Sequence, residues 1–112
     1  MLQQVRSKAA ARGYVYVFGN ACFEPLKVGA TTRDPQIRAL ELSAPTGVPG
    51  GYDILLAEFV PHPFVVEQKV HSLLDGYRLA PNKEFFLCSV EEALRVVRDC
   101  AEEARAMWGG VK

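Results

Sequence analysis

Six polar side chains stand out because they lie where a hydrophobic core would not need them. They comprise two phenols, an ammonium, a guanidinium, a carboxylate and an imidazole: Tyr14, Tyr16, Lys27, Arg38, Glu67 and His71. Tyr14 and Tyr16 alternate in an apolar run, so they share one face of a strand. Glu67 and His71 are four residues apart, so they stack on one face of a helix. Groups of these types can bind an anion, hold a hard cation or move a proton.

Each of these side chains also has an ordinary structural explanation. A strand tyrosine is commonly half-buried with its hydroxyl in water, and a strand lysine is commonly exposed. Arg38 could be a solvated helix residue that pairs with Glu41 or Asp34. Glu67 could be an exposed helix carboxylate that is bonded to His71. The sequence contains no phosphate-binding glycine loop, no nucleophile elbow and no His-Glu-x-x-His zinc motif, which excludes the enzymes that depend on them.

The elements that must position these groups can be predicted from patterning. The β-branched and aromatic residues 14–18 predict a strand, and residues 26–30 predict its hairpin partner. Asp34 and Pro35 are typical of a helix start, and Ile37, Leu40 and Ala44 then predict its buried stripe. Residues 43–51 are rich in Pro and Gly and predict a loop. Residues 53–60 predict a third strand.

Two more helices follow. The first runs from about residue 63 to 75, and its predicted core stripe consists of Val66, Val70, Leu73 and Leu74. A short extended piece follows at 83–87. Ser89 and Glu92 form a capping box. They open a long helix over about 90–108, whose apolar side we expect in a core or an interface: Ala93, Val96, Val97, Cys100, Ala104, Met107 and Trp108. A hairpin, a later strand and packed helices predict an α+β fold.

Composition limits the class of protein. The chain has 112 residues, of which 49% are hydrophobic and 23% charged, as expected for one folded domain over 1–112 and not for a disordered chain. Thirteen basic and thirteen acidic residues give no net charge, which excludes a strongly basic nucleic-acid-binding chain. Residues 1–38 hold six basic residues against two acidic ones, so the first third could form a basic face.

The compartment is predicted from cysteines and from the chain's start. Cys22, Cys88 and Cys100 are odd in number and widely spaced, which favours reduced thiols over disulfides or a zinc site. The first residues lack the apolar segment of a secretory signal, and no stretch fits a membrane span. We expect a cytoplasmic protein with no membrane partner.

Taken in order, the motifs resemble the GIY-YIG nuclease superfamily, and most closely its branch of meiotically up-regulated genes and phage reading frames. Residues 14–16 stand where that family has its first tripeptide, and residues 27–29, Lys-Val-Gly, where it has its second. Residues 33–42 match its first helix, with Arg38 on the characteristic arginine. Residues 46–49, Thr-Gly-Val-Pro, match a loop of this branch. Residues 66–71 place Glu67 on the family's metal-binding glutamate, and residues 84–86, Glu-Phe-Phe, match its closing motif. The resemblance covers about residues 13–100.

The resemblance implies a small, mainly antiparallel three-stranded sheet flanked by helices, and hydrolysis of DNA phosphodiester bonds with one Mg²⁺ or Mn²⁺ ion. Glu67 would hold the metal, and Arg38 would stabilise charge on the phosphate oxygens. Tyr16 would orient or deprotonate water. A free phenol has a pKa of about 10, so it needs a nearby cation, which Lys27 could supply unless Lys27 is itself the base. Tyr14 and His71 would support the site, and Arg33, Arg38 and Lys27 would contact the substrate.

The chain departs from the superfamily pattern at two positions. Lys27 replaces the second tyrosine, as is usual in this branch, and Leu42 stands where the family has a histidine. Together with the absence of net charge, this leaves an alternative: a catalytically inactive module of the same fold that binds nucleic acid or protein. In that case the long last helix would bind a second copy or a protein partner.

Overall fold

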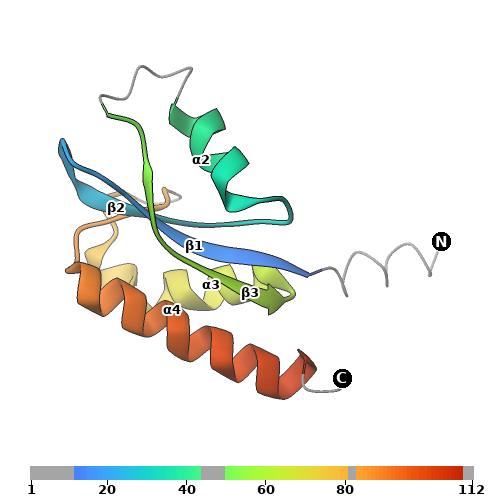
Figure 1. Ribbon diagram of the computed structural model, residues 1–112. Coiled ribbons are helices and arrows are strands. Elements are labelled where there is room, and N and C mark those ends of the chain that lie inside the picture. Colours follow the sequence, from blue (N-terminus) through green and yellow to red (C-terminus); the bar gives the residue numbers. More distant parts are fainter. Residues whose placement is uncertain (1–11, 44–49, 81–82, 110–112) are drawn as a thin grey trace.

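The computed structural model describes residues 12–43, 50–80 and 83–109, and these form an α+β fold, as predicted. The main elements, drawn in Figure 1, are β1 (Arg12–Asn20), β2 (Phe23–Thr31), α2 (Pro35–Ser43), β3 (Asp53–Pro61), α3 (Pro63–Leu73), β4 (Phe85–Phe86) and α4 (Val90–Ala104). A short 3₁₀ turn (Asp75–Tyr77) follows α3, and a π-helical turn (Arg105–Gly109) extends α4. The predicted loop at 43–51 and the predicted position of Ala44 lie largely outside the described residues.

The sheet is antiparallel throughout, in the order β3-β1-β2-β4. Its three long strands are the three that the sequence predicts. The short extended piece expected at 83–87 contributes β4, which pairs with Leu26 and Lys27 of β2 and makes the sheet four-stranded. The predicted hairpin is confirmed, with Tyr16 opposite Gly29 and Phe18 opposite Lys27. Opposite residues point to the same face, so these four share one side of the sheet.

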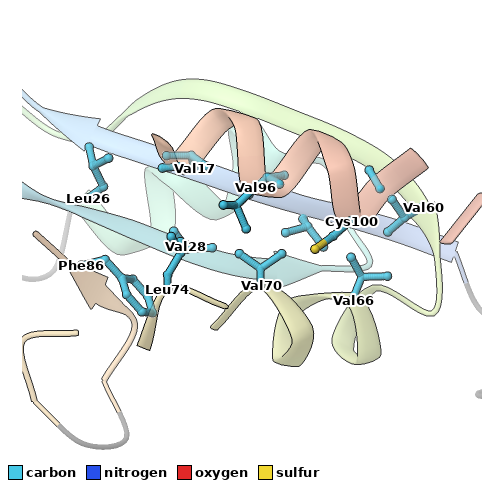
Figure 2. Close-up of a cluster of buried hydrophobic side chains, with 14 of the residues drawn as sticks. Val17, Leu26, Val28, Val60, Val66, Val70, Leu74, Phe86, Val96 and Cys100 are labelled. Carbon is cyan, nitrogen blue, oxygen red and sulfur yellow. The ribbon is translucent and has the colours of Figure 1, made fainter. Parts of the chain in front are cut away.

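Helices cover both faces, as Figure 1 shows: α3 and α4 lie against one face, and α2 lies against the other. The α3/α4 side holds the main core (Figure 2), in which Val17 and Val28 from the strands meet Val70 and Val96 from the helices. Burying an aliphatic side chain of this size contributes about 1.5–3 kcal/mol. The four-residue spacing of Val66 and Val70 on α3 serves this core, and it leaves Glu67 and His71 along the neighbouring side of the helix.

The stripe predicted for α2 is wrong. Ile37 and Leu40 are 46% and 70% exposed, whereas Pro35 and Ala39 are buried. Ala39 joins Tyr16 and Phe18 in a second, smaller core cluster. Both sets of residues have helical spacing, so periodicity alone could not choose between them. The small Ala39 side chain lets the helix approach the aromatic face of the sheet, which a bulkier residue would prevent.

The start of α4 is as predicted, because the backbone N–H of Glu92 donates to Ser89 Oγ at 3.0 Å. The expected apolar side is buried as far as Ala104, but Met107 and Trp108 are 63% and 43% exposed. Leu73 is exposed as well, contrary to the prediction, while Leu74 takes the core position. Within the described ranges, no helix has the length and apolar character needed to cross a bilayer.

Candidate functional site

Four of the predicted residues come from four different elements: Tyr16 from β1, Lys27 from β2, Arg38 from α2 and Glu67 from α3. Two groups of contacts bring them together. Arg38 lowers the pKa of the Tyr16 hydroxyl through a side-chain hydrogen bond, and Lys27 and Glu67 both interact with the side chain of Glu84. The charges of Glu67 and Glu84 also act on the Tyr16 hydroxyl, so the two groups belong to one site.

The Tyr16 ring is held between Phe18 and Gly29. It is almost fully buried, and it stacks on Phe18 with ring centroids 3.9 Å apart and an interplanar angle of 17°. On the β2 side its hydroxyl end passes over Gly29, its cross-strand partner. A Cβ at Gly29 would lie 2.7 Å from Tyr16 Cζ and closer still to the hydroxyl. The glycine of Lys-Val-Gly is therefore needed to make room for the phenol.

Arg38 completes the surroundings of this phenol. Burial raises the pKa of Tyr16, the hydrogen bond from Arg38 opposes that rise, and the nearby Glu84 and Glu67 carboxylates add to it. The hydroxyl is therefore protonated at neutral pH unless additional positive charge arrives. Arg38 is only half-buried, with Nη1 3.4 Å from Glu41 Oε1, so part of the guanidinium remains accessible to an anion.

Lys27, Glu84 and Glu67 form a row of charged groups. Lys27 is 9% exposed; its Nζ lies 2.9 Å from Glu84 Oε1 and 5.0 Å from the centre of the Phe85 ring. Burial raises the pKa of Glu67 to about 7, Glu84 adds to the rise by charge and hydrogen bonding, and Lys27 opposes it. Below about pH 7 Glu67 is therefore mostly protonated and can donate a hydrogen bond to the Glu84 carboxylate.

Carboxylate oxygens are the ligands that Mg²⁺ and Mn²⁺ prefer, and a cation at Glu67 would displace this proton. In the part of the chain that the structure describes, no group of three or more His, Cys, Asp or Glu residues is arranged to hold a metal. The carboxylate of Glu67 and that of Glu84 beside it are oxygen donors of the kind that a hard cation takes.

The predicted supporting residues have other partners. His71 Nε2 lies 2.8 Å from the carbonyl oxygen of Val28. A carbonyl can only accept, so Nε2 carries the hydrogen and donates it, which fastens α3 to β2. The same nitrogen is 3.8 Å from Glu67 Oε2, too far for a hydrogen bond. Tyr14 packs against Phe59, its partner on β3, with ring centroids 5.2 Å apart.

Arg33, predicted to contact the substrate, is exposed and paired. Its Nη1 donates to Glu41 Oε2 and its Nη2 donates to Glu41 Oε1, each at 2.8 Å. The same carboxylate is the near neighbour of Arg38, so one acidic side chain holds both arginines. Such an exposed pair is weak, and an anion of higher charge can compete for both guanidinium groups.

The sequence patterns did not predict that Glu84, the first residue of the Glu-Phe-Phe motif, belongs to the site. A signal was present. Lys27 lies between the apolar Leu26 and Val28, and a buried ammonium needs a carboxylate partner. The short extended segment at 83–87 offers such a carboxylate in Glu84.

Comparison with known proteins gives one match. The T5orf172 domain matches residues 13–101, a range that contains every residue of the site described above. Neither the curated proteins nor the solved structures yielded a match to this chain. The chain belongs to the T5orf172 domain family, a phage open-reading-frame family of nuclease-related domains.

Proposed function

We propose that this chain is a GIY-YIG-type endonuclease that hydrolyses DNA phosphodiester bonds with one divalent cation. The proposal is supported above all by the convergence of Tyr16, Arg38 and Glu67 from three separate elements. Arg38 and Glu67 both act on the Tyr16 hydroxyl. Water attack on a phosphodiester can use a group that orients water, a donor to the phosphate oxygens and a carboxylate that holds a cation.

Each side chain has a part that follows from its contacts. Arg38 binds the non-bridging oxygens of the scissile phosphate with the donors that Tyr16 does not occupy. Tyr16 positions the attacking water through its fixed hydroxyl. Lys27 acts as a cation and not as the base, because its ammonium is paired with Glu84 at 2.9 Å. Water adds through oxygen to phosphorus, the bond to the leaving oxygen breaks, and one proton of the water passes to that oxygen.

The residues present fit a divalent ion. Glu67 would hold Mg²⁺ or Mn²⁺, which supplies positive charge to the leaving oxygen when it is bound. The proton now shared between Glu67 and Glu84 would leave as the ion binds, so Glu67 would meet the cation as a carboxylate.

A plasmid-nicking assay tests this proposal. Supercoiled DNA is incubated with the protein in Mg²⁺, in Mn²⁺ or in EDTA, beside the variants Glu67→Ala and Arg38→Ala. We expect metal-dependent nicking that both variants lose. Glu103→Ala is the matched control, since Glu103 is an exposed helix glutamate that pairs with Lys69 outside the site. Wild-type nicking by a folded Glu67→Ala protein would overturn the assigned mechanism.

A second candidate is a catalytically inactive module that binds nucleic acid or a protein, including a second copy. It is favoured by the absence of net charge and by the exposed Met107 and Trp108, which line an apolar pocket between α3 and α4 with Val65 and Ala104. Light scattering after size exclusion, at a protein concentration of tens of micromolar, tests the self-association. A wild-type dimer that becomes a monomer in Trp108→Ala would support it, and a wild-type monomer would not.

A further inference from the structure

Lys27 is held in place by a residue that has no assigned role. A lysine side chain has four rotatable bonds and loses much conformational freedom when it is fixed. Here the whole Lys27 residue is only 9% exposed, so water has little access to the side chain. Its direct polar contact is Glu84 Oε1 at 2.9 Å, and the Phe85 ring lies under it at 5.0 Å.

The backbone holds Glu84 in this position. Phe85 is the cross-strand partner of Lys27, and the N–H of Val28 donates to the carbonyl of Glu84 at 2.9 Å. Glu84 therefore cannot drift from Lys27 without breaking the β2–β4 pairing. Its side chain is 39% exposed, so it reaches from solvent inward to the buried ammonium.

Glu84 has a second partner. Its carboxylate is hydrogen-bonded to Glu67 of α3, so one side chain joins the ammonium on β2 to the carboxyl on α3. Lys27 and Tyr16 lie on the same face of the hairpin, because Lys27 is opposite Phe18 and Gly29 is opposite Tyr16. Fixing the ammonium against Glu84 therefore also fixes it relative to the phenol.

We propose that Glu84 is a positioning residue: through its ion pair it holds the Lys27 ammonium near Glu67, on the face of the hairpin that carries Tyr16. The catalytic part of this inference rests on the proposed nuclease function, whereas the ordering of Lys27 does not. Without Glu84 the ammonium has no carboxylate partner at the β2–β4 pair, and its long side chain turns toward water. A displacement of about 1 Å in a reacting group can reduce a rate about 100-fold.

The ordering of Lys27 is measured first, by NMR relaxation of its Cε and Nζ in wild type, Glu84→Ala and Glu84→Gln. Glu84→Gln preserves the size of the side chain in case Glu84→Ala fails to fold. We expect an ordered Lys27 in the wild type, a mobile one in Glu84→Ala and an intermediate one in Glu84→Gln. Glu103→Gln is the control and leaves Lys27 unchanged. An equally ordered Lys27 in both Glu84 variants would overturn the inference, whatever the nuclease assay shows.

A double-variant cycle then tests the catalytic part. We expect Glu84→Gln to lower kcat at least about tenfold with little change in KM. Lys27→Met should lower kcat at least as much, and the double variant should match Lys27→Met alone. Losses that multiply would mean that Glu84 acts independently of Lys27, which contradicts a positioning role.

Metal binding separates this role from direct coordination. We expect Glu84→Gln to change the Kd for Mn²⁺, measured by calorimetry, less than threefold, whereas Glu67→Gln weakens it strongly. A tenfold or greater loss in Glu84→Gln would make Glu84 a ligand and overturn the inference. If the wild type nicks no DNA, the proposed function fails, and the NMR result alone decides whether Glu84 positions Lys27.

Discussion

The hydroxyl end of Tyr16 lies over the Cα of Gly29, on the neighbouring strand, with no room for a side chain between them. The first two motifs of the site therefore depend on each other through shape. The first motif provides the phenol. The second provides a glycine, whose lack of a Cβ leaves room for the phenol.

This contact predicts the effect of Gly29→Ala. The new Cβ would meet a ring that is stacked on Phe18 and bonded to Arg38, so the ring cannot move aside cheaply. We expect a loss of about 1–3 kcal/mol in the free energy of unfolding, together with loss of nicking. Urea unfolding measures the first effect. Gly76→Ala is the control, because a Cβ at Gly76 meets no atom within 4 Å; equal losses in the two variants would contradict the steric explanation.

Tyr16→Phe separates the phenol's chemistry from its packing. The ring remains stacked on Phe18, so the free energy of unfolding should change by only about 1 kcal/mol. Nicking should fall about 10²- to 10⁴-fold, the usual contribution of a group that moves or orients a proton. Initial nicking rates at saturating Mg²⁺ provide the measurement. A rate equal to that of the wild type would reduce Tyr16 to a core residue.

The pKa of Glu67 makes the stability of the metal-free protein depend on pH. It is about 7 in the folded protein against a reference of 4.5, so the folded state holds this proton more tightly than the unfolded chain does. The contribution to stability is complete below about pH 4.5 and is lost as the pH rises through about 7.

We therefore expect the free energy of unfolding of Glu67→Gln to increase relative to that of the wild type as the pH rises from 5 to 8. The gain is at most about 3 kcal/mol, from about 1.4 kcal/mol for each unit of pKa. Urea titrations in EDTA at several pH values test it. A difference between the two proteins that is constant with pH would show that Glu67 does not titrate in this range.

Glu41→Gln should strengthen DNA binding. Glu41 accepts hydrogen bonds from both terminal nitrogens of the Arg33 guanidinium and lies beside the guanidinium of Arg38, so removing its charge frees both arginines for phosphates. We expect affinity for a short duplex to rise about twofold to fivefold at 50 mM salt, and less at 200 mM, because exposed charges are screened. Fluorescence anisotropy at the two salt concentrations measures this. Glu103→Gln removes the same charge elsewhere, and an equal gain there would indicate a general charge effect.

His71→Ala should cost stability. It would leave the carbonyl of Val28 without the N–H that now lies 2.8 Å away, in a buried position. We expect a loss of about 1–3 kcal/mol in the free energy of unfolding. His71→Gln, which offers an N–H on a similar side chain, should recover part of it. No loss in His71→Ala by thermal or urea unfolding would mean that this bond does not support the fold.

Local signals predicted the elements that carry the site. Asp34 and Pro35 start α2, with Asp34 Oδ1 accepting the N–H of Gln36 at 2.9 Å, and Ser89 caps α4. The shared face of Glu67 and His71 also followed from spacing, since i and i+4 are neighbours on any helix. Each of these depends on residues that are close in the chain.

Long-range packing could not be predicted in the same way. The choice between two apolar stripes on α2 is made by the aromatic rings of β1, which lie far away in sequence. The pairing of Lys27 with Glu84 spans 57 residues and depends on where β4 joins the sheet. The contact of His71 with Val28, and not with Glu67, depends in the same way on how α3 lies against β2.

That contact also has a consequence for association between molecules. β4 pairs with only two residues of β2, and a sheet edge with free N–H and C=O groups invites another chain to add a strand. At Val28 both backbone groups are already hydrogen-bonded: the N–H donates to the carbonyl of Glu84, and the carbonyl accepts from the His71 ring. The helix that carries Glu67 thus also shields β2 from cross-chain pairing where β4 ends. A variant that loosens α3 would therefore risk aggregation through β2 as well as loss of the site.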